Sequence, residues 1–272
     1  MRNFKNFAIK LRYWKGKNTF ESDDFFCNIF KLKRLNNSRK SLMKIDIQIL
    51  NAKDSWKHQL DVYRGYHEKY ASIYPLESFF YHPYLLEKFS HPNLSERELK
   101  IVETYFKTQI YDQEKLEQAK NTISEKAVPF LLSKNAHLEK LAIKHPDNLT
   151  IKLSGAMSGG FYNVNDSSIT ISPQCVTENF IPLLLVHEFT HICIEEHIQK
   201  NNISHQAKER IVSRICSEIL EFDDHNMVGD KNLDRFLTKD KLSSDFSGVI
   251  SSIKNYYKAN QAIMRNNQNQ GK

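Results

Sequence analysis

The sequence predicts an α+β fold, with a small mixed or antiparallel sheet and mainly helical flanking segments. In two stretches, 45–49 and 149–172, apolar residues alternate with polar ones, which is the period of a half-buried strand. The segments around them repeat their apolar residues at helical spacing. The composition, 40% apolar and 26% charged over 272 residues, is ordinary for a globular protein. No apolar run approaches the ~20 residues of a membrane helix, so we expect no transmembrane segment.

The first half of the domain is predicted to be one strand followed by helices. The alternating isoleucines of 45–49 form the strand, and residues 54–70 place apolar side chains on one side of a helix. A longer helical region begins after Ser95, which forms a capping-box pattern with Glu98. Pro129 should kink or divide this region, because proline lacks the N–H that a helix interior needs.

The second half is predicted to place a strand and a hairpin before further helices. We expect a strand at about 149–154, then a glycine-rich turn and a hairpin across about 161–172. The stretch IPLLLVHEFTHICIEEH, residues 181–197, is apolar enough for a buried helix. Ser204 can cap another helix that extends to about Phe222, and one or two helices should follow.

The net charge of +7 is concentrated at the N-terminus. Residues 1–45 contain twelve Lys or Arg and three acidic residues, whereas the rest of the chain is close to neutral. Such a basic segment could contact nucleic acid or an anionic surface, or it could be a solubilising tail. A start at Met43 would also explain the contrast, because a more protein-like stretch begins there.

The expected compartment is the cytoplasm. The first 20 residues interleave Lys and Arg with aromatic residues and lack the apolar core of a secretory signal. The cysteines are scattered without a CxxC pair, which is typical of free thiols. They are Cys27, Cys175, Cys193 and Cys216.

The buried helix predicted at 181–197 contains an HExxH motif. His187 and His191 are four residues apart, so in a helix they lie on one face and can occupy two corners of a zinc tetrahedron. Glu188 is placed to reach a water on the metal, where glutamate acts as general base. Such polar groups are costly in an apolar helix unless they are satisfied. A metal site therefore explains them better than a pair of hydrogen-bonded core histidines.

A third ligand is expected from the following helix, where Glu209, Glu218 and Glu221 are the candidates. Glu221 falls on the solvent side of the helical wheel, and the other two fall on opposite flanks of the apolar arc. If the first helix ends near His197, Glu209 reaches the level of the histidine pair, and we favour it. If that helix continues to Asn201, Glu209 and Glu218 miss that level by similar amounts.

Residues 146–225 resemble zincin metallopeptidases, and the stretches SGGFYNVNDSSITIS and VHEFTHICIEEHIQKNNISHQAKERIV carry the resemblance. A glutamate as third ligand is typical of the gluzincin, or thermolysin-like, group, whereas the metzincin pattern of Gly and a third His is absent. The chain is also similar to small uncharacterised bacterial HExxH proteins that begin near the equivalent of Met43. Gluzincins tend to carry an acid four residues after the ligand Glu, where it supports the first histidine; here that position is Ser213.

The resemblance implies a zincin-like catalytic domain over 43–272, preceded by a basic extension over 1–42. Within the domain, 43–145 would form a strand and a helical part, 146–225 the metal-site core, and 226–272 the C-terminal helices and tail.

The implied function is that of a zinc-dependent hydrolase, with a metallopeptidase as the leading interpretation. One Zn²⁺ per chain would be held by His187, His191 and Glu209, with Glu188 as general base and a peptide or protein as substrate. His225, or Tyr256 or Tyr257, could supply a second donor to the oxyanion. The edge of the hairpin at 161–172 could hold an extended peptide.

Three other interpretations remain open at this stage. The protein could be an effector that cleaves one host or competitor protein. It could be a zincin-fold binding module with weak catalysis or none. It could also be a nucleic-acid-associated protein that acts through residues 1–45.

Overall fold

The computed structural model describes most of the chain after the predicted basic extension. The described residues are 43–139, 141, 143–155, 159–173, 180–222 and 229–270, with the backbone alone for 261–270. The predicted extension, residues 1–42, lies outside them.

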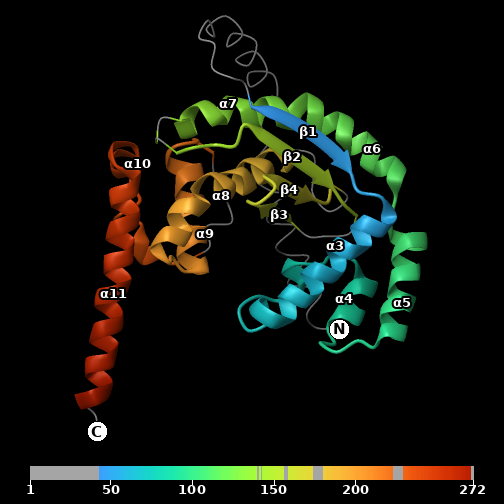
Figure 1. Ribbon diagram of the computed structural model, residues 1–272, viewed down its shortest axis with the longest axis horizontal. Coiled ribbons are helices and arrows are strands. Elements are labelled where there is room, and N and C mark those ends of the chain that lie inside the picture. Colours follow the sequence, from blue (N-terminus) through green and yellow to red (C-terminus); the bar gives the residue numbers. More distant parts are fainter. Residues whose placement is uncertain are drawn as a thin grey trace, which may run out of the picture. The chain divides into compact units, whose positions relative to one another are not determined.

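A four-stranded mixed sheet lies beside the long helix that contains the HExxH motif (Figure 1). Its strands are β1 (Lys44–Ile49), β2 (Asn148–Leu153), β3 (Gly160–Asn163) and β4 (Ser168–Ile171), in the order β1-β2-β4-β3. β1 pairs with β2, and β2 with β4, in parallel, whereas β3 and β4 form an antiparallel hairpin. The predicted strands and the predicted hairpin are therefore confirmed. β3 is an edge strand of this sheet.

Helices occupy most of the first half of the chain. They are α3 (Ala52–Gly65), a π-turn (Tyr66–Tyr70), a 3-10 turn (Leu76–Ser78), α4 (Pro83–Phe89), α5 (Glu96–Tyr105), a π-turn (Phe106–Ile110), α6 (Gln113–Thr122), a π-turn (Ile123–Ala127) and α7 (Val128–Glu139). The capping box is present, because the Ser95 side chain accepts a bond from the Glu98 amide while the Glu98 carboxylate accepts one from the Ser95 amide.

The long helical region is divided twice. The last π-turn lies just before Pro129, which cannot donate a hydrogen bond to the preceding turn, so the predicted disruption at this proline is confirmed. A second break comes at Tyr111, after which the Asp112 side chain caps α6 by accepting a bond from the amide of Lys115.

The second half of the chain is helical after the hairpin. It contains α8 (Ile181–Asn201), α9 (His205–Glu218), a 3-10 turn (Lys231–Leu233), α10 (Lys239–Ser244) and α11 (Phe246–Gln270). α8 ends at Asn202, whose φ of 52° is left-handed, and Ser204 caps α9 as predicted by accepting a bond from the amide of Ala207.

Two hydrophobic clusters hold these elements together. The larger is built from the sheet and from α6 to α11, with fully buried members such as Ile151, Ile169 and Phe189. The smaller, which includes Trp56 and Phe89, joins the helices from α3 to α5. The fold is thus mixed α/β and mostly helical. Among the described residues, no helix has both the length and the apolar character to cross a membrane.

Candidate metal centre

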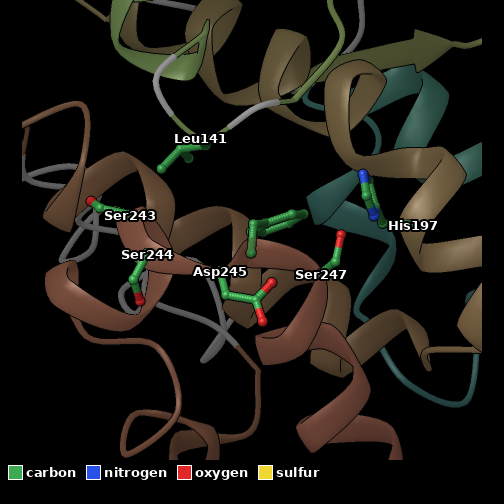
Figure 2. A pocket seen from close by; sticks show the side chains of 7 residues that line it. Leu141, His197, Ser243, Ser244, Asp245 and Ser247 are labelled. Carbon is green, nitrogen blue, oxygen red and sulfur yellow. The ribbon is translucent and has the colours of Figure 1, made fainter.

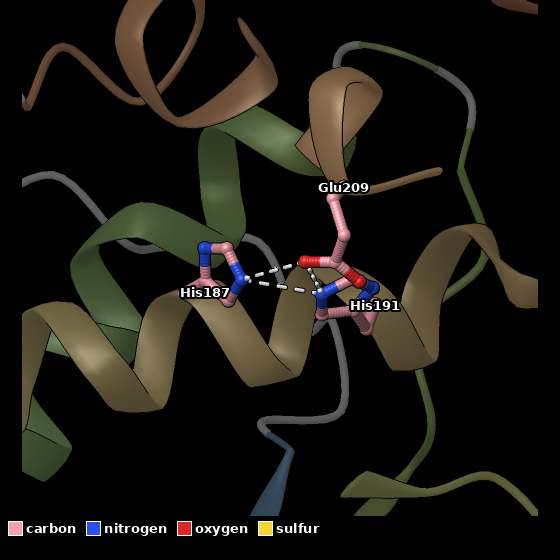
Figure 3. Close-up of side chains that lie close together, drawn as sticks. All are labelled: His187, His191 and Glu209. Atoms are coloured by element: carbon pink, nitrogen blue, oxygen red, sulfur yellow. Dashed lines mark hydrogen bonds and ion pairs between the residues drawn. The ribbon is translucent and has the colours of Figure 1, made fainter. Parts of the chain in front are cut away.

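Helix α8 brings His187 and His191 together on one face. The motif spacing of four residues places one imidazole above the other, and their Nε2 atoms lie 3.2 Å apart. Figure 3 shows both rings pointing away from α8 toward the same point. His191 is buried, with 2% of its surface exposed, and His187 is partly buried. The two Nε2 atoms therefore point to one place at the boundary of the core, where His187 is still partly exposed.

Glu209 reaches the same point from α9 (Figure 3). Its Oε2 lies 3.4 Å from Nε2 of His191 and 3.7 Å from Nε2 of His187. All three donor atoms lie within 4.8 Å of one another. Ligands placed 2.0–2.1 Å from a tetrahedral zinc are roughly 3.3 Å apart. The separations of 3.2, 3.4 and 3.7 Å fall around that value, so the donor set fits a tetrahedral ion with one open position.

The other two candidate ligands are engaged elsewhere. Glu218 pairs with Arg214 at 2.8 Å on its own helix, and Glu221 pairs with Lys239 at 2.9 Å. The expectation that α8 ends near His197 is wrong, since the helix continues to Asn201. The position of Glu209 is therefore not explained by His191 and Glu209 lying at equal distances from the turn between two parallel helices. Instead, the left-handed turn after α8 sets the direction of α9 and thereby the position of Glu209.

The protonation states of the group suit a cation. Burial lowers the pKa of His191 to about 4, although the Glu209 carboxylate opposes this shift. Burial alone would raise the pKa of Glu209, but hydrogen bonds and charge interactions with the two histidines hold it far below its usual range. Near neutral pH, the buried imidazole is thus neutral and the carboxylate charged, which are the forms that bind a metal.

Glu188, the predicted general base, is buried against the edge strand. A Cβ on Gly160 would lie 2.6 Å from Cγ of Glu188 and 2.9 Å from its Oε1. The absence of a side chain at this position therefore gives Glu188 its place between α8 and β3. Gly160 is a contributor that the sequence analysis did not single out, although it lies in the predicted glycine-rich turn.

A second group of side chains supports the site from β3. The ring of Tyr162 stacks on the His191 imidazole, with centroids 4.7 Å apart and planes 5° from parallel. Its hydroxyl donates to Oε2 of Glu195 at 2.9 Å and accepts a bond from Nζ of Lys208. Burial, with the Glu195 charge, raises the pKa of Tyr162 far above its usual value, so the phenol stays protonated. None of these three residues was among the predicted site residues.

Aromatic residues from the first half of the chain approach the other side of Glu209. Nδ1 of His205 lies 3.5 Å from Oε1 of Glu209. The rings of Tyr70 and Tyr74 lie 5.7 and 5.8 Å from the His205 ring. Burial, then the Glu209 charge, raises the pKa of Tyr74, which keeps its hydroxyl a donor. These residues were not predicted either, because about 130 positions separate Tyr74 from His205.

Of the predicted oxyanion donors, Tyr256 and Tyr257 contact residues outside the metal group. His225 lies outside the described residues. The Tyr257 hydroxyl donates to Asp230 at 2.7 Å, and the Tyr256 ring packs on Phe236 with centroids 5.7 Å apart.

Ser213 does not support a histidine. Its hydroxyl is fully buried and has no hydrogen-bond partner among the described residues. Nδ1 of His191 is likewise buried without a partner. The hydrogen bond that the sequence allowed between a serine hydroxyl and an imidazole is therefore not formed, and another contact must orient His191.

A separate pocket of about 260 Å³ lies where the second half of α8 faces the start of α11 (Figure 2). The His197 ring packs edge-on against Phe246, with centroids 5.2 Å apart. The Asp245 carboxylate is occupied at the helix start by the amide of Gly248. The pocket contains none of the three metal-group residues. Its lining is Leu141, His197, Ser243, Ser244, Asp245, Phe246 and Ser247.

Comparison of the chain with family models, with curated proteins and with solved structures gave no match. The function is therefore inferred from the geometry of the site itself.

Proposed function

We propose that this protein is a zinc-dependent hydrolase with a zincin-like, gluzincin-type centre, and that its substrate is a peptide or protein. One observation carries the proposal. Two imidazole nitrogens and a carboxylate oxygen converge at separations of 3.2 to 3.7 Å, and the HExxH glutamate is buried on the same helix. Three protein ligands with one open position are typical of catalytic zinc, whereas structural zinc usually has four.

The zinc ion and the protein side chains would each supply part of the chemistry. His187, His191 and Glu209 would hold the zinc ion, which would supply a water with a pKa lowered toward about 7 and a Lewis acid for the carbonyl. The Glu188 carboxylate, held beside Gly160, accepts the proton of the attacking water and returns it to the leaving amine. His205 and Tyr74 supply donors for the developing negative charge on the carbonyl oxygen.

The edge strand provides a way to hold a peptide. In the described structure, β3 pairs with β4 on one side. Its other edge can pair with an extended segment through backbone hydrogen bonds. Gly160 and Tyr162 on this strand contact Glu188 and His191, so a peptide bound there passes close to the reactive groups. This placement favours a peptide bond over a small soluble ester as the target.

The test combines metal analysis with hydrolysis. The purified protein should hold about one zinc per chain, and His187→Ala should remove it, because only two of the three ligands remain. Glu188→Gln should keep the zinc but lower hydrolysis of a peptide library by at least about a hundredfold, as expected for loss of a general base. A chelator should abolish hydrolysis by the native protein. Full zinc content in His187→Ala would refute the metal centre.

A metal-binding module without catalysis is the second candidate, and Ser213 favours it. The hydroxyl supplies neither charge nor a hydrogen bond to the histidines. Equal hydrolysis by the native protein and Glu188→Gln, with zinc retained in both, would support this candidate.

Nucleic-acid association through residues 1–45 is a third candidate, based on their charge. A chain that starts at Met43 should keep zinc and hydrolysis under the main proposal. Loss of DNA or RNA retention in that chain alone would show a separate function of the extension.

A further inference from the structure

We propose that Tyr162 is a positioning residue for the metal centre: its ring, held by Glu195 and Lys208, fixes the plane of the His191 imidazole in place of a hydrogen-bonded carboxylate. The proposal rests on the metal centre described under the proposed function. It adds residues that the HExxH motif does not contain, and it assigns each of them a measurable effect on metal binding.

The need for such a contact follows from His191 itself. A metal-binding histidine usually donates its second ring nitrogen to a carboxylate or a carbonyl, which fixes the orientation of the ring. Nδ1 of His191 has no such partner within the described structure, although it is buried. Without another restraint, the ring could rotate about its terminal torsion, which has a broad energy profile. That rotation would carry Nε2 away from the other donors.

Parallel stacking supplies the missing restraint. The Tyr162 and His191 rings lie 4.7 Å apart at 5°, so rotation of the imidazole would drive its edge into the phenol ring. Stacked rings also attract each other beyond what their buried area contributes. Tyr162 faces α8 because it lies two residues after Gly160 on β3, and alternate residues of a strand share a face.

Glu195 and Lys208 hold the tyrosine in turn. The hydroxyl of Tyr162 lies between the two charges, which are also 3.6 Å from each other. Gln199 donates to the second oxygen of Glu195 at 3.2 Å, so that carboxylate is satisfied as well. Both charged side chains are largely buried, with exposed fractions of 11% and 13%. Such a pair keeps a fixed geometry, because loss of one partner would leave the other charge buried and unpaired.

The cluster also joins the elements that carry the ligands. Glu195 follows His191 by one helical turn on α8, and Lys208 directly precedes Glu209 on α9. Tyr162 brings in the edge strand. Correct placement of His191 is thereby coupled to the relative positions of β3, α8 and α9.

Three variants of the full chain separate this role from simple packing. Tyr162→Leu removes the ring, Tyr162→Phe keeps the ring but loses the hydroxyl, and Tyr84→Leu removes a stacked tyrosine elsewhere. Tyr84 is the matched control, since its ring stacks on Tyr105 at 3.9 Å in the N-terminal helices. The measurements are zinc affinity by chelator competition, the visible spectrum of the Co²⁺-substituted protein, and thermal unfolding of the metal-free protein.

We expect Tyr162→Leu to weaken zinc binding by about 10- to 100-fold, the range for loss of a contact that orients a metal ligand. The Co²⁺ spectrum should change, because the direction of the His191 nitrogen changes. Tyr162→Phe should recover part of the affinity, because the ring remains but loses its bonds to Glu195 and Lys208. Tyr84→Leu should leave affinity and spectrum unchanged, whatever it does to stability. If Tyr162→Leu fails to fold, Glu195→Gln with Lys208→Met removes both charges together and should weaken zinc binding about tenfold.

Native affinity and an unchanged Co²⁺ spectrum in Tyr162→Leu, or in the double variant if Tyr162→Leu does not fold, would overturn the positioning role. An equal loss of affinity in Tyr162→Phe and Tyr162→Leu would assign the effect to the hydroxyl and overturn the stacking argument. His187→Ala provides the separate check. If that variant also binds zinc normally, the metal centre itself is wrong, and the failure belongs to the proposed function.

Discussion

Substitution of Gly160 by alanine should disturb Glu188 without touching a metal ligand. An added Cβ would lie 2.6 Å from Cγ of Glu188, 3.0 Å from its Cδ and 2.9 Å from its Oε1. Ordinary van der Waals contact begins near 3.4 Å, so the nearest pair must separate by about 0.8 Å. The backbone of Gly160 does not have the positive φ that would itself disfavour alanine. The whole effect should therefore come from the collision with Glu188.

The expected magnitude follows from that displacement. A shift of about 1 Å in a reacting group can lower the rate by about a hundredfold, so we expect Gly160→Ala to lower hydrolysis by roughly 10- to 100-fold. Overpacking of a buried site should lower the free energy of unfolding by about 1–3 kcal/mol. Zinc content should stay at the native level, because His187, His191 and Glu209 are not contacted by the new methyl group.

The assay compares initial rates on the best library peptide, zinc content and thermal unfolding. Gly65→Ala is the control, since a Cβ there would meet nothing within 4 Å. It should change neither rate nor zinc content. Native hydrolysis in Gly160→Ala with normal folding would refute the placement of Glu188 against β3. Loss of zinc would show instead that this contact organises the ligands.

Two further predictions concern charge. Glu209→Ala should weaken zinc binding by chelator competition far more than Glu218→Ala, because the Glu218 carboxylate pairs with Arg214 and lies outside the metal group; equal effects would remove Glu209 from the ligand set. Burial lowers the pKa of His58 from 6.5 to about 4, so its contribution to stability is complete above pH 6.5 and is lost as the pH falls toward 4. Denaturant unfolding of the metal-free protein at pH 7 and pH 4.5 should therefore show a smaller acid loss in His58→Leu than in the native chain, and an equal loss would contradict the shift.

The order of the elements could be predicted because it depends on local patterns. The alternation at 149–154 and 161–172 gave the strand and the hairpin, and the Ser95–Glu98 pair gave a helix start. The π-turns could not be predicted, since they reflect how each helix adjusts to its neighbours as well as its own sequence. The parallel pairing of β1 with β2 was also hidden, because about 100 residues separate these strands.

Within the candidate site, the sequence was informative where spacing along one helix decides the geometry. His187 and His191 meet because a helix places every fourth residue on the same face. Glu209 was favoured through an assumed helix end that proved wrong, and its convergence with the pair depends on the turn at Asn202. A helix length read from apolar periodicity carries an error of a few residues, and each residue moves the predicted level by about 1.5 Å.

Tyr162 shows why the supporting contacts were beyond the sequence. Its register follows from the hairpin, so its face relative to Gly160 could be predicted from alternation. The contact of that face with α8 depends on how β3 packs against the helix, and no local sequence pattern specifies this packing. The HExxH motif records only the groups that share one helix. Nδ1 of His191 lacks a hydrogen-bonded partner, so another part of the fold must orient this ring. The Tyr162 ring stacks on it, and the Tyr162 hydroxyl is held between two opposite charges.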